Sequence, residues 1–134
     1  MAVLRDDRMA LRSVDDIIKA RQLVRDGAIG QGLSLVDQTK LVTAVSEIAR
    51  NTLVHGGGGD MRMEILNDGA QRGVRVTFSD QGPGIADIPL AMKDGYSTAG
   101  GLGLGLGGTK RLVNEFTIES EPGKGTKVTI LRWR

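Results

Sequence analysis

The sequence contains no cysteine, which excludes disulfide bonds and thiolate metal sites. It also lacks any apolar run near the roughly 18 residues that a membrane-spanning helix needs, and its first residues lack the long apolar stretch of a signal peptide. The formal net charge is only +2, and the basic residues are scattered rather than clustered. We therefore expect a cytoplasmic protein that binds neither nucleic acid nor a membrane.

The remaining composition is that of an ordinary globular protein, with 40% hydrophobic and 25% charged residues. A length of 134 residues predicts a single domain over 1–134. Its 20 glycines are roughly twice the usual share of about 7%. Many of them fall in two runs, Gly56–Gly59 and Gly100–Gly108, which lack the serine and proline of flexible linkers. These runs are therefore predicted to be shaped loops.

Hydrophobic periodicity predicts both helices and strands. Ser13 and Ser34 are predicted to be helix N-caps because of the residues that follow each of them. The second of these helices is expected over Leu35–Val54. A third helix is expected over about 109–114, and the expected strands are 9–12, 61–65, 74–78, 116–118 and 127–131. Together these elements predict an α/β (α+β) two-layer sandwich, in which helices cover one face of a mixed, mainly antiparallel sheet.

The helix over Leu35–Val54 has two polar residues on a shared face. Glu47 and Asn51 are four residues apart, so both side chains project from the same side of the helix. A carboxylate and an amide oxygen suit Mg²⁺ and its waters, and a carboxylate can accept a proton from an attacking hydroxyl. The alternative is a solvated helix face without chemistry.

A second candidate site follows the strand over 74–78. Asp80 stands at the end of that strand, where its carboxylate can accept a hydrogen bond from the exocyclic amine of a purine. Gly82 and Gly84 would allow the backbone to pass close to a ring or to adopt a positive φ. A simple surface turn is the alternative for this Gly-Pro-Gly segment.

The third candidate is the glycine run that precedes the helix expected from Thr109. Backbone N–H groups beside a helix N-terminus suit phosphate oxygens, whereas the alternative is a flexible hinge. The run contains a nominal G-x-G-x-x-G at Gly103–Gly108, but no hydrophobic strand comes before it, so it does not predict a dinucleotide-binding fold. A Walker loop and the motifs of the eukaryotic-type protein kinases are also missing.

In combination, these three segments resemble a known family. Glu47-x-x-x-Asn51, Asp80-x-Gly82-x-Gly84 and Gly101-x-Gly103-x-Gly105 are similar to the N, G1 and G2 boxes of the GHKL ATPases, which have the Bergerat ATP-binding fold. Gly123-x-Gly125-Thr126 resembles the last motif of that family. The motifs have the family's order and spacing, and they cover almost the whole chain.

The resemblance implies a role for each matching residue. Glu47 would be the general base, Asn51 would hold Mg²⁺ against the phosphates of ATP, and Asp80 would bind the adenine amine. The resemblance also implies a short lid over 85–100. The further ATP-binding residues that it implies are Gly82, Gly84, Ile85, Gly101, Leu102, Gly103, Leu104, Gly105 and Thr126.

Within the family, the size and motifs resemble the bacterial anti-sigma-factor serine kinases, above all the stressosome switch kinases. That resemblance implies an ATP-dependent serine/threonine kinase that phosphorylates STAS-domain proteins and then activates an output protein such as a PP2C-type phosphatase. The alternatives are an anti-sigma factor with serine kinase activity and a nucleotide-dependent binding switch with little catalysis. The sequence lacks the Met-Gly-Phe type segment of the anti-sigma kinases after the lid, which weakens the first alternative.

Overall fold

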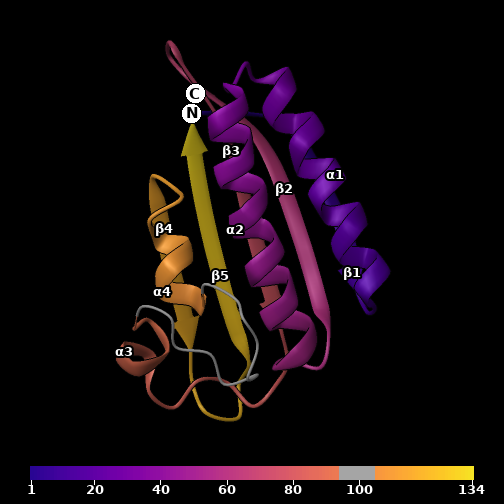
Figure 1. Cartoon of the computed structure of the whole chain (residues 1–134), viewed down its shortest axis with the longest axis vertical. Coiled ribbons are helices and arrows are strands. Elements are labelled where there is room, and N and C mark those ends of the chain that lie inside the picture. Colours follow the sequence, from indigo (N-terminus) through magenta and orange to yellow (C-terminus); the bar gives the residue numbers. More distant parts are fainter. Residues whose placement is uncertain (94–104) are drawn as a thin grey trace.

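The computed structural model describes residues 1–93 and 105–134, which form five strands and four helices (Figure 1). No helix in these two ranges is long and apolar enough to cross a membrane. In chain order, the elements are β1 (Ala2–Leu11), α1 (Val14–Gly30), α2 (Leu35–Val54), β2 (Gly59–Asp68), β3 (Gln71–Asp80), α3 (Ile88–Ala91), α4 (Gly105–Lys110), β4 (Glu115–Ser120) and β5 (Thr126–Trp133).

The strands form one sheet in the order β1-β2-β3-β5-β4, and each neighbouring pair is antiparallel. Helices α1 and α2 lie side by side against one face of this sheet, and both labelled termini lie at the same end of the molecule (Figure 1). The two-layer α/β fold expected from the sequence is therefore confirmed. The sheet is antiparallel throughout the described residues, without the parallel pairing that a mixed sheet would contain.

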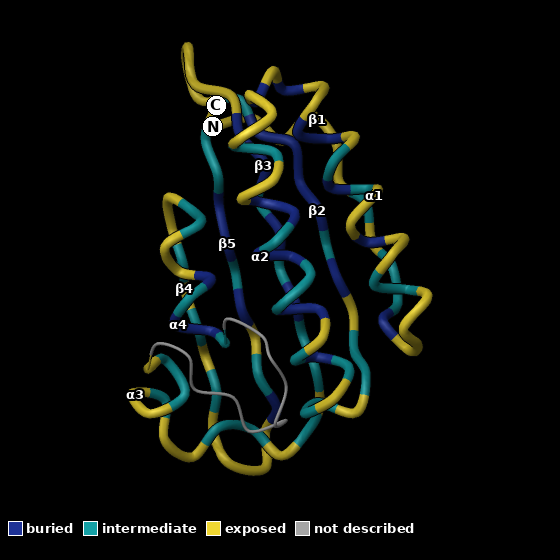
Figure 2. The backbone as a smooth tube through the Cα atoms, in the orientation of Figure 1, coloured by how far each residue is buried: buried dark blue, intermediate teal, exposed yellow. Residues whose placement is uncertain are grey.

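Helix α2 is the central element of the core. It begins and ends where its periodicity predicts, and the Ser34 hydroxyl caps it by accepting a hydrogen bond from the Asp37 N–H at 3.1 Å. Its apolar stripe, with Leu41, Val45 and Ile48 fully or almost fully buried, packs on the sheet. Burial is concentrated between the helices and the strands behind them (Figure 2). This packing fixes the rotation of α2 and therefore the direction in which the polar residues of its other side project.

Three elements differ clearly from the sequence prediction: helix α3 was not predicted, and β1 and α4 have other bounds. Strand β1 starts at Ala2 instead of Met9, because its first residues pair with β2 and its charged side chains have partners across or along the strand, as Asp6 has in Arg62 and Arg5 has in Asp7. Helix α4 spans Gly105–Lys110 instead of about 109–114. A Cβ atom at Gly107 would overlap the Met92 carbonyl oxygen, so the glycines let α4 lie against the end of α3.

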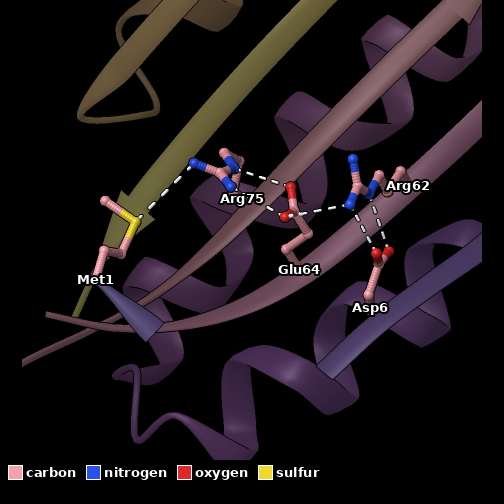
Figure 3. A network of polar contacts seen from close by, with 5 residues as sticks. All are labelled: Met1, Asp6, Arg62, Glu64 and Arg75. Carbon is pink, nitrogen blue, oxygen red and sulfur yellow. Dashed lines mark hydrogen bonds and ion pairs between the residues drawn. The ribbon is translucent and has the colours of Figure 1, made fainter. Parts of the chain in front are cut away.

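The sheet face that lies away from the helices carries a row of four charges (Figure 3). Arg75 donates two hydrogen bonds to the Glu64 carboxylate, at 2.9 and 3.0 Å, and Arg62 donates two to Asp6, at 3.0 and 2.7 Å. Glu64 is only 4% exposed. The hydrogen bond from Arg75 lowers the pKa of Glu64 below its ordinary value, against the opposing effect of burial.

This pairing makes stability depend on pH. Because the pKa of Glu64 is lower in the folded state, its contribution is fully present above the ordinary carboxyl value of 4.5 and is lost as the pH falls through the folded pKa. We expect Glu64→Gln to lower the free energy of unfolding by about 1–2 kcal/mol at neutral pH, less than for a fully buried pair because Arg75 stays partly exposed. Urea titrations at pH 7 and pH 4 measure this difference.

The matched control is Glu119→Gln, which removes an exposed carboxylate from the same sheet. The control should change stability little at either pH. A deficit in Glu64→Gln that is as large at pH 4 as at pH 7 would contradict the linkage, since a lost packing contact has no such pH dependence.

Candidate active site

A cavity of about 370 Å³ opens at the C-terminal half of α2. Its wall is built from five parts of the chain: α2, the end of β3 with the loop after it, α3, the start of α4 and the start of β5. Segments far apart in the sequence therefore meet at one place. In Figure 1 these segments gather at the end of the molecule opposite the two termini.

Helix α2 contributes the predicted pair Glu47 and Asn51 to this cavity. Both are half-buried, while Ile48 and Thr52 beside them are buried in the core. The core side of α2 thus fixes its rotation, so that the carboxylate and the amide face the cavity together. If this were only a solvated helix face without chemistry, the two side chains would not be expected to line one cavity.

Asp80 lies at the end of β3 and also lines the cavity. Its Oδ1 atom accepts hydrogen bonds from the backbone N–H groups of Gly82, at 2.9 Å, and Thr126, at 3.2 Å. These two bonds fix the plane of the carboxylate and occupy one oxygen. The other oxygen, Oδ2, accepts no hydrogen bond from the described residues and stays available to a donor on a ligand.

Glycines surround Asp80 because nothing larger fits there. A Cβ atom at Gly56 would lie 2.6 Å from the Asp80 Cβ, and one at Gly82 would lie 2.6 Å from the Gly56 Cα. At Gly125, where φ is +80°, a Cβ atom would overlap the Asp80 carbonyl oxygen. Gly84 has φ +76° and packs in the same way on the Glu121 carbonyl oxygen. The Gly-Pro-Gly segment is therefore part of the cavity wall and not only a surface turn.

Ser120 connects the two loops on this side of the cavity. Its hydroxyl accepts a hydrogen bond from the Ile85 N–H at 2.8 Å, donates to the Gly125 carbonyl at 2.9 Å and lies 2.8 Å from the Thr126 hydroxyl. Ile85 and Thr126, both expected from the sequence to bind ATP, line the cavity.

Sequence reasoning missed Ser120 and missed the role of Gly56. Gly56 was predicted only to belong to a shaped glycine loop, and Ser120 belongs to no motif of the sequence analysis. The one available signal was indirect: Ser120 stands directly before the turn that leads to Gly125 and Thr126.

The glycine run that was expected to bind phosphate is described only from Gly105 onward. Gly101, Leu102, Gly103 and Leu104 lie outside the described residues. Gly105 has φ +69°, begins α4 and lines the cavity together with Leu106. The start of α4 thus lines the same cavity as Glu47 and Asn51 on α2.

The oxygen donors in this cavity fit Mg²⁺ in the form in which it accompanies ATP. No group of three or more histidine, aspartate or glutamate residues within 1–93 and 105–134 is placed to form a protein cage for a metal. Mg²⁺ is commonly held by one or two protein oxygens together with phosphates and waters. Asn51, with Glu47 beside it, offers such a set.

Comparison with known proteins agrees with this geometry. Residues 36–134 match the model of the histidine kinase-, DNA gyrase B-, and HSP90-like ATPase family. The chain is 46% identical over 118 residues to the serine/threonine-protein kinase RsbT of Bacillus subtilis (strain 168), covering 88% of this chain and 89% of RsbT. It is 30% identical over 103 residues to an anti-sigma F factor of Geobacillus sp. (strain WCH70), covering 71% and 68% of the two chains.

A solved structure shows the same fold. The RsbU and RsbW domains of a Mycobacterium tuberculosis protein match with a TM-score of 0.67 and 22% identity, over 97% of this chain and 32% of that one. The likeness to RsbT over most of both proteins also confirms the expected enzyme class, an ATP-dependent protein serine/threonine kinase. The chain belongs to the histidine kinase-, DNA gyrase B-, and HSP90-like ATPase family.

Proposed function

We propose that this protein transfers the γ-phosphate of ATP to a serine or threonine hydroxyl of a STAS-domain protein in a bacterial stress-signalling partner switch. The observation that supports this most is that Glu47 and Asn51 share one cavity with Asp80 and the start of α4. Two carboxylates, an amide and a glycine at the start of a helix therefore line one cavity, which supports the proposed roles of base, metal ligand, adenine acceptor and phosphate loop. A cytoplasmic location and release to a PP2C-type output protein are part of the proposal.

Each residue has one task in this mechanism. Asp80 accepts a hydrogen bond from the adenine amine through Oδ2 and so fixes the end of the cavity where the base lies. Gly105 and the start of α4 present backbone N–H groups to the phosphates. Glu47 accepts the proton of the substrate hydroxyl as that oxygen attacks the γ-phosphorus. When bound, Mg²⁺ neutralises phosphate charge, and Asn51 would hold it.

Asn51→Ala tests the metal assignment. Removal of the amide oxygen should weaken ATP binding in Mg²⁺ by about tenfold or more, the effect of one lost contact to a charged group of roughly 1.5–3 kcal/mol. Calorimetric titration with ATP in Mg²⁺ and again in EDTA measures this. The two proteins should bind ATP equally in EDTA. A loss of the same size in both buffers would remove Asn51 from the metal site.

The direct experiment is transfer of labelled phosphate. The full chain is used to capture its partners from native cells, and a captured STAS-domain protein is then incubated with γ-labelled ATP and the pure kinase. We expect label on a serine or threonine of that protein, and none when its acceptor is changed to alanine. Captured STAS protein that stays unlabelled would contradict the proposal.

The second candidate function, sequestration of a sigma factor, is supported by the likeness to anti-sigma F factors. The same capture experiment distinguishes the two functions. A sigma subunit among the bound proteins, with no STAS-domain protein, would favour the anti-sigma function.

A further inference from the structure

One arginine in the wall of the active-site cavity has no partner among residues 1–93 and 105–134. Arg50 is on α2, one residue before Asn51, and lines the same cavity as Glu47. It is exposed, and no hydrogen bond or ion pair joins it to another residue in the described part of the chain. Of the described residues that line the cavity, it is the single lysine or arginine.

This arrangement is unlike that of the arginines that support the fold. Arg62, Arg75 and Arg132 are each held by a carboxylate, at 2.7, 2.9 and 2.6 Å. Arg50 is three residues after Glu47, a spacing that allows an ion pair on a helix, yet the structure contains none between these two described residues. Arg50 is therefore free to bind a group that enters the cavity.

Helix geometry places Arg50 next to Glu47 around the axis of α2. With 3.6 residues per turn, Asn51 lies about 40° around the helix from Glu47 on one side, and Arg50 lies about 60° from it on the other. The proposed base thus stands between the proposed metal ligand and a guanidinium group.

The negative charge of the cavity and of a bound triphosphate would favour a cation such as Arg50 in the cavity wall. Among the described lining residues of the cavity, Glu47, Asp80 and Asp87 carry acidic side chains, and Arg50 carries a positively charged one. A triphosphate adds further negative charge, and the transferring phosphoryl group spreads charge over three oxygens. The planar fork of an arginine matches such oxygens better than a lysine does.

We propose that Arg50 is a catalytic residue whose guanidinium binds the γ-phosphoryl oxygens during transfer, an inference that rests on the proposed function. The substrate hydroxyl gives its proton to Glu47, and its oxygen forms a bond to the γ-phosphorus. The bond from that phosphorus to the β–γ bridging oxygen breaks, and its electron pair stays on ADP. Arg50 exchanges no proton and stabilises the charge as it moves.

Steady-state kinetics of Arg50→Ala provide the first test. We expect kcat for phosphorylation of the partner to fall by about 10²–10³, the usual effect of removing one preorganised charge-stabilising group. The KM values for ATP and for the partner should stay close to those of the wild type. Added guanidinium ion should restore part of kcat. Arg21→Ala, which removes an exposed arginine from α1, should show neither the loss nor the rescue.

One kinetic outcome would overturn the proposal. If Arg50→Ala raises the KM for the partner and leaves kcat unchanged, then Arg50 binds an acidic part of the substrate protein instead of the phosphoryl group. Arg50→Lys refines the test, because it keeps the charge and loses the planar fork. It should give a kcat between those of the wild type and Arg50→Ala.

Binding of ADP with Mg²⁺ and aluminium fluoride tests the contact without any protein substrate. The wild type should bind this phosphoryl mimic more tightly than ADP, and Arg50→Ala should lose the difference while it keeps its affinity for ADP. Equal gains in the two proteins would overturn the proposal. If the wild type phosphorylates no protein but the Arg50-dependent gain is present, then the proposed function fails and the phosphoryl contact stands.

Discussion

Replacement of Glu47 by glutamine is expected to leave ATP bound and to lower phosphate transfer to the partner by roughly 10²–10⁴, the usual contribution of a general base. Glutamine keeps the length and one carbonyl oxygen of the side chain but cannot accept the proton of the substrate hydroxyl. Because Glu47 lines the cavity and is only half-buried, its replacement should not disturb the core beneath α2. Single-turnover transfer from labelled ATP measures the chemical step directly.

Glu47→Asp is the matched variant for this prediction. It retains a basic carboxylate but withdraws it by one methylene, so its rate should lie between those of the wild type and Glu47→Gln. Circular dichroism and melting curves should be the same for all three proteins, which excludes a general defect of α2. A Glu47→Gln protein that transfers phosphate at the wild-type rate would show that positioning of ATP alone suffices.

The positions of the main elements were predictable where one local signal dominates. Helix α2 has apolar residues at helical spacing along its 20 residues and a serine N-cap. In the structure it begins and ends at the predicted residues. Strand β1 had no such signal, because the run of charged residues Arg5–Arg8 interrupts hydrophobic alternation and the strand is defined there by its pairing with β2. Hydrophobic alternation could therefore not show where that strand begins.

The active site divides in the same way. Glu47 and Asn51 were recognisable because helix spacing alone places them together. The support of Asp80 was not, since it depends on backbone N–H groups from two distant segments, at Gly82 and Thr126. The close approach of Gly56 is likewise a tertiary contact that no local pattern encodes.

That support gives a second large expected effect, because it determines what Asp80→Asn would present to ATP. The Asp80 Oδ1 atom already accepts two backbone N–H groups, so the amide oxygen of an asparagine would take its place and the NH₂ group would face the cavity. A donor would then meet the adenine amine, which is also a donor. Loss of a hydrogen bond to a charged acceptor costs roughly 1.5–3 kcal/mol, or about 10–150-fold in ATP affinity.

The geometry also predicts a change of specificity, which a mere loss of stability would not give. The NH₂ group of Asp80→Asn can donate to the carbonyl oxygen that guanine carries in place of the adenine amine. The affinity for ATP should therefore fall more than the affinity for GTP, which lowers the preference for ATP over GTP. Calorimetric titrations with both nucleotides measure this ratio. Asp60→Asn makes the same substitution at an exposed residue of β2 outside the cavity and should leave the ratio unchanged. If folded Asp80→Asn protein retains the wild-type preference for ATP, then Asp80 does not recognise adenine. Two donors that face each other cannot form a hydrogen bond, and the substitution adds nothing that would replace the lost one.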